Sequence, residues 1–131
     1  MTQEDKELLL KDLCARLPYS VQVYVERDKY AQATLLGVDT KQFSITFGGS
    51  NWSSTSNIEG HHIEQYKQLI KPYLRPMSSM TKEEEIEWYE DVTTTLDCDK
   101  QIDFYNKYHF DYRGLIEKGL ALEAPENMYN N

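Results

Sequence analysis

The residues best suited to acid–base chemistry lie near the C-terminal end of this 131-residue chain, in the stretch KYHFDYRGLIEKGLALEAP at positions 107–125. His109, Asp111 and Arg113 occupy alternate positions there, and a carboxylate that orients a histidine can form a general base. A strand would place the three on one face, whereas a cap followed by a helix would separate them. No nucleophile or phosphate-binding loop accompanies them in the sequence. We therefore predict that this motif is structural, and we assign no catalytic residue.

The structural interpretation of the motif rests on start and stop signals for a short helix. Asp111 precedes YRGLIEKG and is expected to accept hydrogen bonds from free backbone N–H groups. Gly119 is expected to supply the left-handed residue at the end, and Gly114 to permit close packing. Leu115 and Ile116 would anchor the helix, and the following LALEA would add a final short strand or an extended segment.

Two other groups of residues could bind a metal ion. His61, His62 and Glu64 offer at most three ligands, whereas a structural zinc site normally uses four. The acidic pair in DCD at positions 97–99 is better explained as a helix cap than as a calcium site, which requires several more oxygen ligands. We therefore predict no metal ion and no cofactor.

The two cysteines, Cys14 and Cys98, lie far apart in the sequence and neither belongs to a CxxC motif. A disulfide or a zinc site is therefore not expected, and both are interpreted as reduced, structural thiols. The N-terminus is charged where a signal peptide would be apolar, and no apolar run approaches the roughly 20 residues needed to cross a bilayer. These features predict a cytoplasmic protein that does not enter a membrane.

The net charge of −8 is unevenly distributed along the chain. Residues 1–76 hold nine basic and nine acidic residues, whereas residues 77–131 hold five basic and thirteen acidic residues. Direct binding to a phosphate backbone requires clustered Lys and Arg, and the sequence contains no such cluster. Nucleic-acid binding is therefore not expected.

Residues 2–17 are predicted to form a helix that begins at Thr2 and ends before Pro18. Acidic residues follow Thr2, as is favourable at the positive end of the helix dipole. The expected buried stripe has helical spacing and comprises Leu10, Leu13, Cys14 and Leu17.

Three strands are predicted at residues 21–25, 30–38 and 43–47. The connections are short and polar, which favours antiparallel pairing of neighbours. Gly37 in the second strand indicates a bulge or bend. We expect a small, curled, half-barrel-like antiparallel sheet of three or four strands.

The polar stretch at residues 48–62 is predicted to be a loop, with Trp52 tucked against the body or available to a partner. Residues 63–70 have helical spacing. Pro72 and Pro76 then favour an extended strap that lays Tyr73 against the body.

A capping box at Thr81 and Glu84 starts a predicted helix over residues 81–96, and a second helix is predicted over 97–109. The first should turn Ile86 and Tyr89 inward. The fold class is thus α+β, with a helix and sheet region at 1–76 and an acidic helical region at 77–131, packed together as one domain.

Three stretches, LKDLCARLPYSVQVYV, IKPYLRPMSSMTKEE and DFYNKYHFDYRGLIEKGLALEAPENMY, carry a resemblance that covers about half of the chain. They resemble a family of small uncharacterised proteins encoded by phages, prophages and other mobile elements of gut bacteria. The resemblance implies a bacterial, cytosolic setting and a mobile-element origin. It implies no activity for any residue.

The lack of a catalytic constellation favours a non-enzymatic protein-interaction module that binds a protein partner. Tyrosine and tryptophan are common interface anchors, and carboxylates can complement a basic surface. One alternative is an acidic inhibitor of a nucleic-acid-binding protein. Another is a small ligand binder or enzyme that uses a cleft between the sheet and the strap, near His109, Asp111 or Tyr73. The residues predicted to bind a partner are Trp52, Tyr73, Glu83, Glu84, Glu85 and Trp88.

Overall fold

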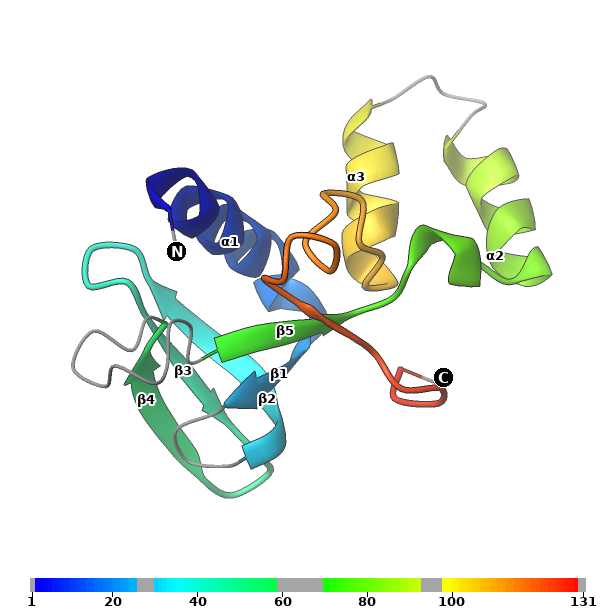
Figure 1. Ribbon diagram of the computed structural model, residues 1–131. Helices are drawn as coiled ribbons and strands as arrows, with labels where there is room; N and C mark the ends of the chain where they lie inside the picture. Colours follow the sequence, from blue (N-terminus) through cyan, green and yellow to red (C-terminus); the bar gives the residue numbers. More distant parts are fainter. Residues whose placement is uncertain (1, 26–29, 59–69, 93–97, 130–131) are drawn as a thin grey trace.

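An N-terminal helix, an open sheet and two later helices make up the α+β fold, which confirms the predicted class (Figure 1). The computed structural model describes residues 2–25, 30–58, 70–92 and 98–129. In chain order the main elements are α1 (Gln3–Arg16), β1 (Gln22–Val25), β2 (Tyr30–Asp39), β3 (Ser44–Gly48), β4 (Ser53–Asn57), β5 (Ile70–Leu74), α2 (Lys82–Glu87), α3 (Cys98–Lys107) and β6 (Leu122–Glu123). Short 3₁₀ turns lie at Leu17–Tyr19 and Met77–Ser79, and a π-helical turn, η3, continues α2 over Trp88–Val92.

Helix α1 begins at the predicted cap, where Thr2 and Asp5 form a capping box. Its buried face differs from the predicted stripe and comprises Leu9, Asp12, Leu13 and Arg16. Asp12 and Arg16 are charged and form an ion pair with each other. Because the prediction followed the spacing of apolar residues only, it placed the buried face one residue away from its position in the structure. Cys14 consequently lies at the surface, and the prediction of a packed thiol at that position is wrong.

The sheet has six strands in the order β4-β3-β2-β1-β5-β6. Neighbours pair antiparallel except for β5 and β6, which are parallel. The register between β2 and β3 shifts between Leu35 and Gly37, which confirms the predicted bulge. The predicted half-barrel of three or four strands is wrong, because β4 and β6 lie at opposite ends of the strand order and the sheet stays open.

Two strands come from segments that the sequence predicts otherwise. Strand β4 lies within the predicted loop at 48–62, and its residues are all polar, so it lacks the apolar alternation that marks a strand. The predicted strap is β5, which pairs with β1 through Pro72 opposite Val23. On the other side of β5, strand β6 pairs only with Tyr73 and Leu74. Pro72 therefore has no partner strand on that side, and the N–H group that proline lacks is not needed there for a hydrogen bond between strands.

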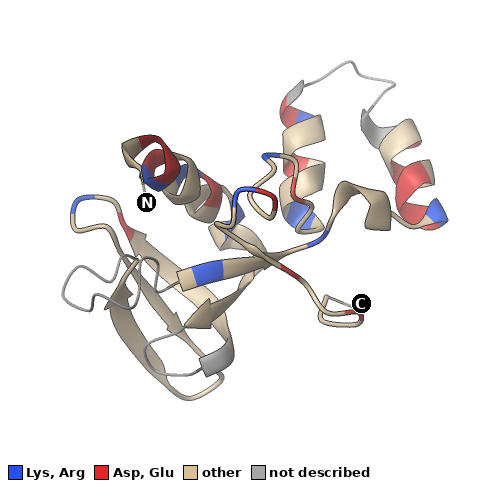
Figure 2. Cartoon of the chain, in the orientation of Figure 1, with Lys and Arg blue, Asp and Glu red and all other residues tan. Residues whose placement is uncertain are grey.

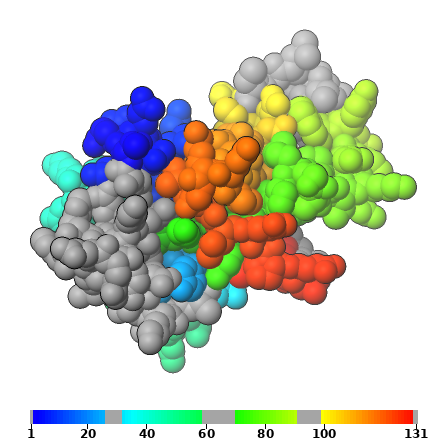
Figure 3. All heavy atoms as spheres, in the orientation of Figure 1, coloured from blue at the N-terminus to red at the C-terminus, as the bar shows by residue number. Residues whose placement is uncertain are grey.

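The hydrophobic core divides into two clusters. The larger joins α1 to the sheet and to the segment after α3, with Leu9, Val23 and Leu115 fully buried. The smaller lies at α3 around Phe104 and Phe110, with Trp88 packed against it. Figure 3 shows residues 110–120, in orange, between α1 in blue and the helices α2 and α3 in green and yellow. This segment therefore connects the two clusters.

Candidate functional site

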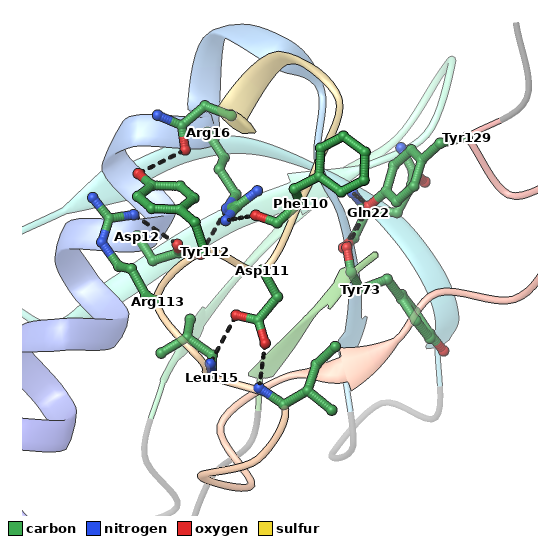
Figure 4. Close-up of polar contacts among 12 residues, drawn as sticks. Asp12, Arg16, Gln22, Tyr73, Phe110, Asp111, Tyr112, Arg113, Leu115 and Tyr129 are labelled. Atoms are coloured by element: carbon green, nitrogen blue, oxygen red, sulfur yellow. Dashed lines mark hydrogen bonds and ion pairs between the residues drawn. The ribbon is translucent and has the colours of Figure 1, made fainter. Parts of the chain in front are cut away.

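Asp111 caps the segment that follows α3, as the sequence predicts, but that segment forms turns and not the predicted short helix. Its carboxylate accepts hydrogen bonds from the N–H groups of Leu115 at 2.7 Å and Ile116 at 3.0 Å (Figure 4). The helical turn ends at Gly119, which has φ +78°. The following N–H of Leu120 donates to the carbonyl of Leu115 at 2.9 Å, which completes a Schellman-type end. Both carboxylate oxygens of Asp111 thus serve the backbone.

Arg113 pairs with α1 and belongs to a buried network that the sequence does not reveal. The Asp12 carboxylate lies 2.8 Å from Nη1 of Arg113 and 2.9 Å from Nε of Arg16 (Figure 4). Nη2 of Arg16 donates to the carbonyl of Phe110 at 2.6 Å. Asp12 and Arg16 are fully buried. The network therefore fastens α1 to the segment after α3.

His109 closes helix α3 in a left-handed conformation, with φ +65°. The N–H of Phe110 donates to the carbonyl of Tyr105 at 2.8 Å, and the N–H of His109 donates to that of Asn106 at 3.2 Å, which is again a Schellman-type end. Glycine is the usual residue at this position, although histidine enters the left-handed region more readily than most residues. His109 therefore ends helix α3, whereas Asp111 accepts hydrogen bonds from the following turn, and the two do not form a catalytic pair.

His109 is 7% exposed, and its imidazole stacks on the ring of Tyr129, with centroids 3.7 Å apart. Its Nδ1 atom is buried and has no hydrogen-bond partner in the described part of the chain. Burial lowers the pKa of His109, and the positive charges of Arg16 and Arg75 act in the same direction, so that together they bring it to about 4. At neutral pH the ring is uncharged.

Tyr129 holds the C-terminal segment against the sheet. Its hydroxyl donates to the carbonyl of Tyr73 at 2.8 Å and accepts from the N–H of Gln22 at 2.8 Å, so it joins β5 to β1 (Figure 4). Burial raises the pKa of the Tyr129 phenol well above its ordinary value. The hydroxyl therefore stays protonated and hydrogen-bonded.

His109 and Tyr129 line a cavity of about 300 Å³ at the C-terminal end of α3. The same cavity is lined by Arg75, Glu84 and Lys107. Arg75 meets Glu84 with two contacts of 2.7 Å, and its remaining Nη hydrogens reach the carbonyls of Ser79 and Tyr108.

The pKa of Glu84 reflects two opposing effects. Burial acts to raise it, but hydrogen bonds from Arg75 and Thr81 outweigh burial, so the pKa lies below its usual value. Arg75 and Glu84 thus neutralise each other at the edge of the cavity.

The six predicted partner-binding residues fall in different places. Glu83 and Glu85 are exposed on α2, whereas Glu84 caps that helix and pairs with Arg75. Trp88 is half-buried, with its ring 6.3 Å from that of Phe104.

The two remaining residues belong to the sheet. Trp52 packs edge-on against Phe47 at 6.2 Å, which agrees with the tucked alternative, and stays 38% exposed. Tyr73 is half-buried in β5, and burial raises its pKa. The structure therefore does not gather the six into one surface.

An exposed apolar group on the two later helices replaces the predicted inward face. Ile86 is 57% exposed, Tyr89 is 76% exposed, and Ile102 on α3 is 43% exposed. The inward prediction for Ile86 and Tyr89 is wrong, because the Arg75–Glu84 pair and the packing of Trp88 turn another side of α2 inward. Figure 2 shows acidic residues along α2. We call Glu83, Glu85, Ile86 and Tyr89, which are exposed on α2 and its continuation η3, the hairpin surface.

His61, His62 and Glu64, which were considered as metal ligands and not assigned that role, lie outside the described residues, as does Asp97. Within the described ranges, no group of three or more His, Cys, Asp or Glu side chains is placed to hold a metal ion. No helix among those residues is both long and apolar enough to cross a membrane. Comparison with protein-family models, curated proteins and solved structures finds no match to this chain.

Proposed function

We propose that this chain is a non-enzymatic protein-interaction module that binds a basic protein through the hairpin surface. The observation that carries the proposal is the exposure of Ile86 and Tyr89, at 57% and 76%, on a helix whose other side is anchored to the body. Large apolar side chains that gather in water mark interaction sites more often than scattered ones do. The bacterial, cytoplasmic setting and mobile-element origin belong to the same proposal.

The chemistry of the partner follows from the charges that surround the apolar group. Residues 82–92 contain six acidic residues and one basic residue, Lys82. Glu83 and Glu85 are exposed beside Ile86. A complementary surface therefore presents Lys or Arg side chains around an apolar depression that receives Ile86 and Tyr89.

The experiment is affinity capture from bacterial lysate, followed by titration of the recovered protein. We expect Tyr89→Ser and Ile86→Ser each to weaken binding at least tenfold, since buried anchors of this type dominate interface energies. Leu36→Ser is the matched control, because Leu36 is 48% exposed on strand β2. A partner that binds all three variants as tightly as the unchanged chain would contradict the proposal, as would failure to recover a stoichiometric partner with folded bait.

The acidic residues are tested separately by a change of charge at constant shape. Replacing Glu83 and Glu85 by Gln should weaken binding about fivefold at low ionic strength, and this difference should shrink as salt is added. Replacing the exposed Glu117 and Glu126 by Gln removes the same charge elsewhere on the chain and serves as the control. Equal losses in both pairs would show that net charge, and not the hairpin surface, attracts the partner.

A second candidate function is the inhibition of a nucleic-acid-binding protein. The acidic excess confined to residues 77–131 supports it, because carboxylates on a helix can occupy a groove that normally holds phosphates. If this is the function, double-stranded DNA should displace the captured partner from the chain in proportion to its concentration. A ternary complex containing the chain, the partner and DNA would exclude it.

A further inference from the structure

The two edges of the sheet are built differently. At one edge, β6 is two residues long, contains Glu123 and is followed by Pro125, and short length, charge and proline all discourage further pairing. At the other edge, β4 has five uncharged residues, no proline and an uninterrupted register with β3. No strand in the described part of the chain pairs with the outer side of β4. Strand β4 thus lacks the features that keep an edge from pairing with another strand.

The pairing of β4 with β3 determines which backbone groups of β4 point outward. At the two ends of this ladder, the N–H of Ile58 donates to the carbonyl of Phe43 at 3.0 Å, and the N–H of Gly49 donates to the carbonyl of Trp52 at 3.1 Å. Hydrogen-bonded pairs alternate with pairs that are not hydrogen-bonded along an antiparallel ladder. The N–H and C=O groups that face away from β3 therefore belong to every second residue of β4, namely Ser53, Thr55 and Asn57.

The charge of the molecule lies far from this edge. No charged residue occurs between Lys41 and Glu59, and Figure 2 shows β4 without a charged side chain, whereas acidic residues lie along α2. Figure 1 places β4 and α2 at opposite ends of the molecule. Two copies joined along β4 would therefore keep their acidic helices apart, although each chain has a net charge of −8.

We infer that β4 pairs antiparallel with β4 of a second copy of this chain, around a two-fold axis at Thr55. In this register Thr55 lies opposite Thr55 of the second copy, and Ser53 lies opposite its Asn57. Each of these opposing pairs exchanges two hydrogen bonds, so every outward N–H and C=O group of both strands finds a partner. The symmetry uses the β4 edge of both copies, so the assembly closes as a dimer.

The side chains on the exposed face favour the second copy over an unrelated strand. The hydroxyls of Thr46 and Thr55 lie 3.3 Å apart on that face, on neighbouring strands. In the dimer this pair continues directly into the same pair of the second copy, as one row of threonines across the joined sheet. Threonines that lie opposite each other on neighbouring strands stabilise a sheet.

The dimer is expected to be weak, because two five-residue strands bury less than the roughly 1,200 Å² of a stable interface. We expect a Kd between about 10 μM and 1 mM. Trp52 would lie opposite Ile58 of the second copy in this register, so its exposed fraction of 38% should fall on association. Its fluorescence should therefore shift to shorter wavelength as the concentration rises, whereas that of Trp88 should not.

The test is a concentration series of the isotope-labelled full chain, from micromolar to millimolar, followed by sedimentation and nuclear magnetic resonance. Sedimentation should show a monomer that converts to a dimer and to no larger species. Amide exchange at Ser53, Thr55 and Asn57 should slow at least tenfold as the dimer forms. Exchange at Ser54 and Ser56 should change much less, because their N–H groups already face β3. A dimer that instead shifts the signals of the hairpin surface would contradict the inference.

Two variants at one position separate pairing at the edge from loss of the fold. Thr55→Pro removes an outward N–H and no hydrogen bond to β3, and Thr55→Lys keeps that N–H but brings like charges together at the two-fold axis. Each should weaken dimerisation at least tenfold, whereas Thr46→Lys, which makes the same change of charge one strand inward, should weaken it less than threefold. Circular dichroism checks that each variant is folded.

Two results would overturn the inference. One is a chain that stays monomeric at millimolar concentration, which would leave the edge of β4 to a different strand. The other is folded Thr55→Lys that dimerises as tightly as the unchanged chain.

Discussion

At the scale of single residues, His109 combines three features that each cost stability. It takes a left-handed backbone conformation, with φ +65°, it buries a nitrogen without a partner, and it lies near Arg16 and Arg75. Its stacking on Tyr129 and its burial offset part of this cost.

The lowered pKa of His109 predicts a specific loss of stability in acid. The pKa is about 4 in the folded chain and near 6.5 when unfolded, so the unfolded chain binds the proton more readily between these values. The contribution is complete above about pH 6.5 and is lost as pH falls toward 4, with a total of about 3 kcal/mol. Urea unfolding at pH 7 and pH 4.5 measures this change in the free energy of unfolding.

The control for this prediction is His109→Asn, which lacks the titrating ring. Its stability at pH 7 should already be lower because stacking on Tyr129 is lost. Between pH 7 and pH 4.5 it should lose less stability than the unchanged chain. Identical losses in the two proteins would show that carboxylates, and not His109, account for the pH dependence.

At the scale of elements, the two turns that end in left-handed residues decide how the segment after α3 is placed. The first lies at His109 and the second at Gly119, and each has the crossed hydrogen bonds of a Schellman-type end. Asp111 lies between them and caps the second turn. Polar residues near the C-terminus are thus set by backbone geometry, as the sequence predicts.

A comparison of two glycines tests this conclusion. Gly119→Ala should lower the free energy of unfolding by about 1 kcal/mol, because φ is +78° there and alanine resists that conformation. Gly37→Ala should change stability much less, since an added Cβ would meet only ordinary contacts at 3.6 Å or more. Thermal and urea unfolding provide the measurement. A larger loss for Gly37→Ala would mean that the bulge in β2 matters more than the turn after α3.

At the scale of the whole molecule, the question is whether residues 1–76 and 77–131 unfold together. The Asp12–Arg16–Arg113 network crosses this boundary, and so does the pair of Arg75 with Glu84. Removing one partner from a buried ion pair is strongly destabilising, so these contacts favour coupled unfolding. The prediction of one domain stands on this argument.

The two tryptophans allow this prediction to be measured. Trp52 lies beside strand β4 and Trp88 packs at α3, so each region has its own fluorescent reporter. Trp88→Phe leaves Trp52 as the reporter, and Trp52→Phe leaves Trp88. In each variant, the urea midpoint from tryptophan fluorescence should equal the midpoint from circular dichroism. Midpoints that differ between the reporter and circular dichroism would show two separately unfolding units.

Much of the fold follows from local patterns in the sequence. The capping boxes at Thr2 and Thr81 mark the starts of α1 and α2, and apolar alternation locates β1, β2 and β3. These features depend on neighbours within a few residues, so the sequence shows them directly. The α+β class and the capping role of Asp111 follow for the same reason.

The tertiary structure alone decided which faces are buried and which residues meet. Polar strand β4 forms because β3 supplies its partners, and α1 turns Asp12 and Arg16 inward because Arg113 and the carbonyl of Phe110 lie there. The cavity at His109 likewise joins segments from both ends of the chain. Local spacing specifies each element, but long-range contacts are set by how the elements pack, and the candidate sites depend on those contacts.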